Sequence, residues 1–440
     1  MKTLADLTAT DALEKMRASE ISCSDLVEAC ISRIEEREDD VQAWEFFDAA
    51  YAREQAQSAD QALAGGGSLA ALHGIPVAIK DIIATADMPT QDGTPIHKGR
   101  QPEEDATCVR ALRDAGAVIM GKSVTTELAT LTPGKTRNPR NPEHTPGGSS
   151  SGSAAAVACG MVPLALATQT GGSVVRPASF CGIYGLKPTR GLISRTGVTL
   201  QSQTLDTVGV YGRSLDDLAL ITDVLSASDV RDDVSYPRFR PNLGEALKAE
   251  QFPTPRLAFC HTPAWSEADK EAQVAITKLA TSLGETCIAA RLPIELDDII
   301  RVHSRVQSAE NAHHFDPLLQ RSGHLLSQGL RNRLEVGNAI SAKDYLDAMG
   351  RREPMYQAFL NFMLDHDAVL CLSSPGPAPR GLASTGSPVF NGMWTFLGVP
   401  TVTLPLMEVG GLPVSAQLVG RRQDEGRLLR AAKWLVQRLG

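Results

Sequence analysis

The chain has 440 residues, of which 42% are hydrophobic and 21% charged, and its formal net charge is −8. This composition is typical of a globular protein with a large core. Lys and Arg are scattered along an acidic chain, which argues against a nucleic-acid partner and a basic membrane patch. We find no signal-peptide apolar region and no apolar run of transmembrane length. The eight cysteines are widely spaced without a CxxC pair, so we expect free thiols and a cytoplasmic location.

The first 65 residues predict helices. Asp11 and Glu14 have the spacing of a capping box at the start of a short helix. From Leu26 to Ile34, apolar residues recur every three or four positions, which indicates one buried helical face.

An alternation of strands and helices follows. The apolar run 75–79 predicts a buried strand that ends at Lys80. Residues 105–114 predict a helix that ends before Gly116, and residues 117–120 predict the next strand. Such alternation is typical of an α/β layered fold.

After a mainly helical region at about 266–365, the C-terminal part of the chain again predicts short apolar strands. The expected elements are a Pro-, Gly- and Ser-rich loop at 138–153, a helix starting in 154–158, a glycine turn at 171–173, a surface crossing at 228–256, strands at 401–406 and 414–419, and a helix from Glu425. We expect a single domain over 1–440, made of N-terminal helices at 1–65, a core at 66–225, a helical substrate region at 266–365 and a C-terminal part of the core at 368–440.

Residues 116–123 match the phosphate-binding pattern GxxxxGK[ST], but their context argues against nucleotide binding. A phosphate cradle needs a flexible loop between a strand and a helix. Here a helix comes first, and the four middle residues are apolar and strand-like. We therefore expect no nucleotide to bind at this segment.

Two segments rich in serine and glycine, 146–153 and 168–173, are the unusual features of the chain. Either alone could be a linker, but each adjoins an apolar element, and the small residues 154–158 favour close packing. A serine on a glycine turn can be approached closely by a substrate, and successive backbone N–H groups can form an oxyanion hole.

A serine hydroxyl needs a base before it attacks a carbonyl. None of the nine histidines lies in a nucleophile-elbow motif. Lys80 ends an apolar strand, and burial lowers the pKa of a lysine because it disfavours the ammonium form. A fall of about 3 units from the ordinary value would leave Lys80 half neutral at pH 7.

The run from Pro146 to Gly191, PGGSSSGSAAAVACG through TQTGGSVVRP to GLKPTRG, resembles the amidase-signature family. HGIPVAIKD at 73–81 is similar to the family's lysine strand, and LGVPTVTLP at 397–405 also fits. The resemblance covers most of 20–225 and 368–435. It implies the amidase-signature fold, an α/β fold in which helices cover both faces of a central mixed sheet.

The resemblance also implies site roles. Ser173 would be the nucleophile, Ser149 the bridging serine and Lys80 the base that receives the proton through Ser149, with Ser150 hydrogen-bonding nearby. The oxyanion would be held by the backbone N–H groups of Thr170, Gly171, Gly172 and Ser173. The product would form through an acyl-enzyme on Ser173, without metal or cofactor.

The chain departs from the common family form GTDTGGSIRxP beside the nucleophile. Gln169 replaces the aspartate, Val175 replaces the arginine, and an arginine stands one place later at Arg176. This pattern resembles the malonamidase-like branch, in which such an arginine meets a substrate carboxylate, and a guanidinium fits a carboxylate bidentately. We expect Arg176, Gly148 and Gln169 to contact substrate; the alternative for Arg176 is a structural pairing with a protein carboxylate.

Other reactive residue types have structural interpretations. Without accompanying metal-ligand spacing, His313 and His314 are expected on a solvated helix, and Cys159 and Cys181 as packing residues. Asp206 and Arg213 are expected to be structural. Gln417 is expected to shape the cleft.

The sequence leaves two functions open. The first is a stand-alone amidase for a small amide, with a homodimer implied by the resemblance. The second is the glutamine-hydrolysing subunit of a tRNA-dependent amidotransferase, which shares the signature and passes ammonia to a partner chain.

Overall fold

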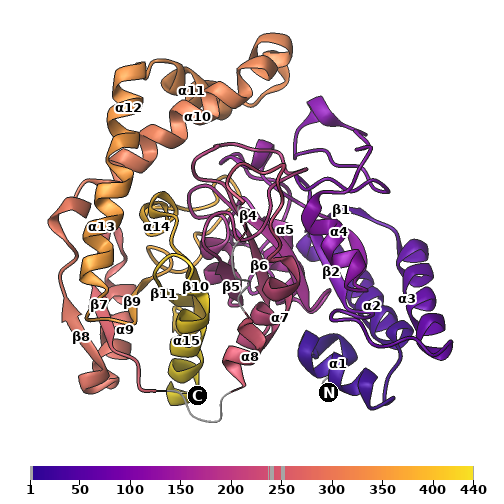
Figure 1. Ribbon diagram of the computed structural model, residues 1–440. Helices are drawn as coiled ribbons and strands as arrows, with labels where there is room; N and C mark the ends of the chain where they lie inside the picture. Colours follow the sequence, from indigo (N-terminus) through magenta and orange to yellow (C-terminus); the bar gives the residue numbers. More distant parts are fainter. Residues whose placement is uncertain (1–2, 236, 238–241, 249–252, 440) are drawn as a thin grey trace.

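The computed structural model describes residues 3–235, 237, 242–248 and 253–439 (Figure 1). Within them, eleven strands form one sheet in the order β1-β3-β2-β4-β6-β5-β10-β11-β9-β7-β8. The strands are β1 Trp44–Phe47, β2 Pro76–Lys80, β3 Val118–Ser123, β4 Leu164–Gln169, β5 Tyr184–Lys187, β6 Thr207–Gly212, β7 Leu257–Cys260, β8 Cys287–Ala290, β9 Ala368–Leu372, β10 Thr401–Val409 and β11 Leu412–Val419.

The sheet is mixed. β2 pairs in parallel with both β3 and β4, and β7 pairs in parallel with both β8 and β9. The pairs β1–β3, β4–β6, β6–β5, β5–β10, β10–β11 and β11–β9 are antiparallel.

Helices cover both faces of this sheet, as the sequence predicts for the amidase-signature fold. They are α1 Ala9–Arg17, α2 Cys23–Val41, α3 Ala49–Ala64, α4 Thr107–Asp114, α5 Ser151–Ala158, α6 Val175–Cys181, α7 Leu215–Leu225, α8 Leu243–Leu247, α9 Lys270–Ser282, α10 Ile299–Ser322, α11 Gln328–Asn338, α12 Ala342–Gly350, α13 Arg352–Phe362, α14 Gly392–Leu397 and α15 Glu425–Leu439. Helices α10 to α12 project from one side of the molecule (Figure 1). No helix among the described residues combines the length and apolarity needed to cross a bilayer.

Most of the predicted elements are confirmed. The apolar positions from Leu26 to Ile34 lie on α2 and are buried. The run 75–79 becomes β2 and ends at Lys80 as expected. The helix–strand unit after residue 105, both C-terminal strands and the last helix are also present.

Some boundaries differ. The N-cap of α1 is Thr8, whose hydroxyl accepts from the Asp11 backbone N–H, so the predicted capping box at Asp11 is wrong. Helix α5 begins at Ser151, three residues before the predicted start, because Ser and Gly there pack like the alanines that follow. The predicted helical region 266–365 also contains β8, a strand with two exposed central residues and little apolar alternation. The first 65 residues, predicted to be helices, also contain the strand β1. Part of the predicted crossing at 228–256 lies outside the described residues, and the rest contains α8.

The parallel pairing of β2 with β4 positions the site. Since the carboxyl ends of parallel neighbours meet at one edge of a sheet, Lys80 and the turn after Gln169 emerge side by side. Helix α5 begins at the same edge and packs so closely that a Cβ on Gly152 would lie 2.2 Å from the Ala43 carbonyl oxygen. Small residues in α5 are therefore a steric requirement of the close approach of the backbone.

Candidate active site

Lys80 and Ser149 are in direct contact. Lys80 Nζ donates to Ser149 Oγ at 2.7 Å and to Thr168 Oγ1 at 2.8 Å. All three residues are buried, and Lys80 and Ser149 have no exposed surface. The two hydroxyls fix the lysine amine between β2 and β4, facing the serine that the resemblance gives as the bridge.

The surroundings of Lys80 favour its neutral amine. In the part of the chain that the structure describes, no carboxylate forms an ion pair with it. Burial holds the pKa of Lys80 well below its ordinary value, and the Asp206 carboxylate opposes this effect only in part. A neutral amine can accept a proton, so this geometry provides a base without histidine.

The segment around Ser149 is tied to β4. The peptide bond between Gly148 and Ser149 is cis. The Ser150 hydroxyl lies 3.3 Å from both the carbonyl oxygen and the backbone nitrogen of Thr168, donating to the first and accepting from the second. Ser150 thus contacts Thr168, which in turn contacts Lys80, so Ser150 lies near the lysine as the resemblance implies.

The turn at 170–173 is held through its carbonyl groups. His303 Nε2 contacts the Thr170 oxygen at 3.0 Å, and Thr395 Oγ1 donates to the Gly171 oxygen at 2.9 Å. The backbone carbonyl oxygen of Ser173 accepts from Asn391 Nδ2 at 2.9 Å and from the Tyr211 hydroxyl at 3.1 Å. These side chains come from distant segments: His303 lies on α10, Tyr211 on β6, and Thr395 on α14, with Asn391 just before that helix. The spacing of the sequence motifs does not predict that these segments meet at the turn.

The opposite side of this turn is available to a ligand. The backbone N–H groups of Gly171, Gly172 and Ser173 donate to no group among the described residues. All three residues line a cavity of about 40 Å³ together with Thr170. Such unpaired N–H groups on a glycine turn can stabilise a negative oxygen.

Ser173 lies in the wall of the same cavity and is 8% exposed. Its hydroxyl makes no hydrogen bond to a described residue, so the structure joins Lys80 to Ser149 but not Ser149 to Ser173. Catalytic hydrogen bonds are often long or unformed before substrate binds.

Gln169 is placed differently from the expectation that it contacts substrate. Its Oε1 accepts from the backbone N–H groups of Val174 and Val175 at 2.9 and 3.0 Å, and its Nε2 donates to Thr395 Oγ1 at 2.9 Å. The side chain is buried beneath the turn and is absent from the cavity wall. Its amide is engaged in holding the protein together, so we do not assign it a substrate contact.

Arg176 is buried and belongs to the cavity wall. Its Nη2 donates to the Gly148 carbonyl at 2.6 Å and to Thr385 Oγ1 at 3.2 Å, while its Nε and Nη1 have no partner among the described residues. Burial lowers the pKa of Arg176 to about 10. No carboxylate of the described residues pairs with Arg176. The structure therefore does not support the alternative in which Arg176 forms an ion pair with a protein carboxylate. The Gly148 carbonyl accepts a hydrogen bond from Arg176, and the expected substrate contact of Gly148 stays a prediction.

Arg333 on α11 is a site residue that the sequence interpretation missed. It lines the cavity with Ser173, and no acceptor within the described chain bonds to it. Burial lowers its pKa, with no compensating carboxylate. Nothing in the helical pattern of α11 distinguishes Arg333 from Arg331, two residues earlier, so only the fold reveals it.

The remaining reactive side chains have structural places. All eight cysteines are free and buried, and burial raises the pKa of the Cys159 thiol to about 12, which makes it a poor nucleophile. Lys122, from the phosphate-loop pattern, lies inside β3 and donates to Ile83, Thr85 and Thr90, so this segment is no phosphate cradle. No group of three or more His, Cys, Asp or Glu side chains in the described chain is arranged to hold a metal ion.

Three further residues hold backbone segments. Asp206 accepts from the Thr170 hydroxyl and from the backbone N–H of Gln201, and Arg213 donates to the carbonyl oxygens of Leu7 and Val162, which fits the structural places expected for both. Gln417 donates to the carbonyls of Leu372 and Phe390 and is absent from the cavity wall.

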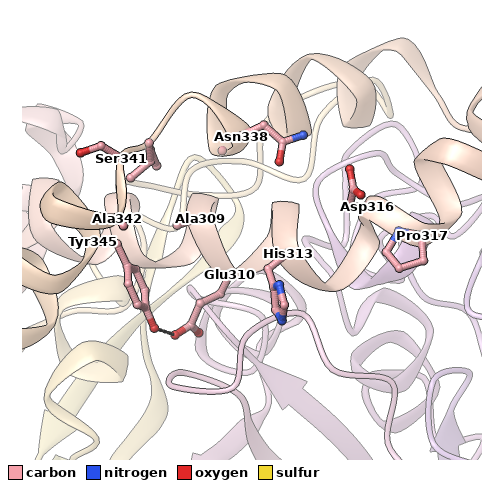
Figure 2. A pocket seen from close by; sticks show the side chains of 11 residues that line it. Ala309, Glu310, His313, Asp316, Pro317, Asn338, Ser341, Ala342 and Tyr345 are labelled. Carbon is pink, nitrogen blue, oxygen red and sulfur yellow. Dashed lines mark hydrogen bonds between the residues drawn. The ribbon is translucent and has the colours of Figure 1, made fainter.

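A larger cavity of about 860 Å³ lies between α10, α11 and the start of α12 (Figure 2). Glu310 and His313 of α10 line it, and the Tyr345 hydroxyl donates to Glu310 at 2.7 Å. Glu310 also accepts from the hydroxyls of Ser202 and Thr204. The lining of this cavity contains neither a serine–lysine pair nor a glycine turn, the two features expected of the active site.

Comparisons with known proteins identify relatives along the whole chain. The amidase family model matches residues 25–429. The A subunit of glutamyl-tRNA(Gln) amidotransferase from Chloroflexus aurantiacus is 33% identical over 485 residues, covering 100% of this chain and 99% of that protein. A structure of a vestigial protein complex that reveals the origins of an s-triazine catabolic enzyme has a TM-score of 0.92 at 25% identity and 99% coverage of both chains. Peptide amidase from Stenotrophomonas maltophilia has a TM-score of 0.85 at 27% identity, covering 99% of this chain and 97% of that one.

Proposed function

The chain belongs to the amidase family of enzymes that act on carbon–nitrogen bonds, and we propose that it hydrolyses a small carboxylate-bearing amide through an acyl-enzyme on Ser173. The observation that carries this proposal is the contact of 2.7 Å between the buried Lys80 amine and Ser149 Oγ, beside a turn with unpaired N–H groups. A base, a relay and an oxyanion hole at one sheet edge are the parts that serine-based acyl transfer requires.

The proposed cycle begins when the Ser173 hydroxyl forms a hydrogen bond to Ser149 Oγ as the substrate binds. Lys80 takes the Ser149 proton, Ser149 takes the Ser173 proton, and Ser173 Oγ attacks the carbonyl carbon. The N–H groups of Gly171, Gly172 and Ser173 stabilise the resulting oxyanion. Return of the proton to the leaving nitrogen releases ammonia or an amine, and water then hydrolyses the ester on Ser173.

The proposed carboxylate specificity rests on two arginines. Arg176 and Arg333 lie in the wall of the cavity that contains Ser173, and neither pairs with a carboxylate of the described chain. The Arg176 guanidinium is buried without a counter-charge, which is costly, and a substrate carboxylate would relieve this cost. The half-buried Arg333 adds a second positive charge to the same wall. The malonamidase-like branch stays a prediction that rests on Arg176.

Replacement of Ser173 by alanine tests the mechanism. We expect turnover to fall roughly 10⁴- to 10⁶-fold, and mass spectrometry of acid-quenched reactions to find an acyl group on Ser173 of the wild type alone. Ser151→Ala is the control, since Ser151 makes only a 3.3 Å contact to a backbone carbonyl. Normal turnover by Ser173→Ala on every amide would contradict the proposal.

The second candidate function is hydrolysis of glutamine within a tRNA-dependent amidotransferase. The full-length similarity to the amidotransferase A subunit favours it over a stand-alone enzyme. Glutamine is itself a small amide with a carboxylate, so both candidates use the same site.

A substrate panel separates the two candidates. Glutamine, malonamate, succinamate and neutral amides are assayed with the isolated chain, and the chain is purified from its source cells to identify bound partners. Turnover of malonamate or succinamate without a partner supports the stand-alone enzyme. Glutaminase activity only in complex with a second chain supports the amidotransferase function. Homodimer formation and a cytoplasmic location stay predictions.

A further inference from the structure

Two glutamine side chains, Gln201 and Gln307, lie in the wall of the cavity that contains Ser173. Gln201 comes from the loop before β6 and Gln307 from α10, outside the lysine strand and the two serine- and glycine-rich segments. Neither has a place in the proposed serine–lysine mechanism.

Gln201 has a fixed carboxamide with an unpaired oxygen. Its backbone N–H donates to Asp206 Oδ2 at 2.6 Å, and its Nε2 donates to the Ala129 carbonyl at 2.5 Å. The residue is 3% exposed, and its Oε1 has no hydrogen-bond partner within the described chain. A buried acceptor without a partner is costly, so it favours a ligand that supplies an N–H or O–H donor.

Gln307 lies over the oxyanion turn. Its Oε1 is 3.7 Å from the position that a Cβ atom on Gly171 would occupy. Its carboxamide forms no hydrogen bond to another described residue. Gln307 is one helical turn after His303, which contacts the Thr170 carbonyl, so α10 both holds the turn and presents an amide beside it.

Asn311, one further turn along α10, connects the two segments. When the Asn311 carboxamide nitrogen faces these two segments, it donates to the backbone carbonyl oxygens of Gln307 and Gln201, both at 3.1 Å. The contact fixes the position of α10 relative to the loop before β6. Both glutamines are thereby held at the cavity by protein contacts rather than by a ligand.

We propose that Gln201 and Gln307 determine specificity by accepting hydrogen bonds from the N–H groups of the substrate's scissile carboxamide. The inference rests on the proposed function and names a feature of its substrate: a primary amide is preferred over the matched ester. An ester offers no N–H at the leaving atom. A site built to bind an N–H group discriminates against an analogue that lacks it.

The test uses Gln307→Met and Gln201→Met, which keep side-chain length and remove the carboxamide. Two matched pairs of probes are assayed: glutamine with the 5-methyl ester of glutamate, and malonamate with methyl hydrogen malonate. We expect kcat/KM for the amide to fall about 10-fold or more in each variant, and kcat/KM for the ester to change less than about threefold.

The matched control is Gln203→Met. Gln203 lies on the same loop, but its carboxamide donates to Asp233 at the exposed surface. Thermal melting of all variants separates misfolding from a specific effect. Equal losses on amide and ester, or an unchanged amide kcat/KM, would overturn the proposal. Acyl-enzyme trapping on Ser173 tests the proposed function independently, so the two failures are distinguishable.

Discussion

Gln169 and Thr395 form a buried hydrogen bond of 2.9 Å that connects the end of β4 to α14. Thr395 Oγ1 donates onward to the Gly171 carbonyl at 2.9 Å. Gln169 Oε1 meanwhile accepts from the N–H groups of Val174 and Val175, on the other side of the nucleophile. These neutral contacts hold both ends of the turn at the position where the common family form has an aspartate and an arginine.

We expect Thr395→Val to lower kcat roughly 10-fold or more while KM changes little, because the oxyanion turn loses a support. Thr395→Ser should restore most of the activity, since it keeps the hydroxyl. Thr401→Val is the matched control, because the Thr401 hydroxyl is buried without a partner in the described chain. Unchanged kcat in Thr395→Val would show that the turn does not need this contact.

Replacement of Lys80 by methionine should lower kcat/KM by at least 10²- to 10⁴-fold, the range typical of a general base. Lys80→Arg should be equally inactive, since a guanidinium does not release its proton in proteins. Steady-state kinetics on the best amide of the panel measure both. Substantial activity in Lys80→Arg would contradict the assignment of Lys80 as the base.

The lowered pKa of Lys80 also predicts a pH dependence. Activity should fall as the pH drops through this pKa, because the amine becomes protonated. Between this pKa and the unfolded value of about 10.4, the unfolded chain binds a proton that the folded chain lacks, so stability rises with pH in that window. Thermal melting should show a smaller rise with pH in Lys80→Met; an identical rise would mean that Lys80 is charged in the folded protein.

Replacement of Arg333 by methionine should reduce kcat/KM for carboxylate-bearing amides about 10- to 100-fold, with little change for neutral amides. Arg176→Met should reduce turnover of both classes, since Arg176 also donates to the Gly148 carbonyl beside Ser149. Arg305→Met is a control on α10, where Arg305 pairs with Asp344 at 3.6 Å. Equal losses on acidic and neutral amides in Arg333→Met would remove Arg333 from carboxylate recognition.

The sequence by itself determined the elements whose signal is local. A continuous apolar run predicts β2 and places Lys80 at its end, and the serine- and glycine-rich motifs carry the resemblance that names Ser149 and Ser173. The helical face of α2 and the C-terminal strands also follow from the spacing of apolar residues. In each case, neighbouring residues contain the information.

Only the tertiary structure decided which distant side chains meet at the turn. Gln169 and Thr395 are 226 positions apart, and His303 is 133 positions from Thr170. It also moved Gln169 from the expected substrate contacts to the supports of the turn and brought Arg333, Gln201 and Gln307 into the cavity wall. Hydrogen bonds of this kind depend on how β4, α10, α11 and α14 pack, and side-chain spacing along the chain does not encode that packing.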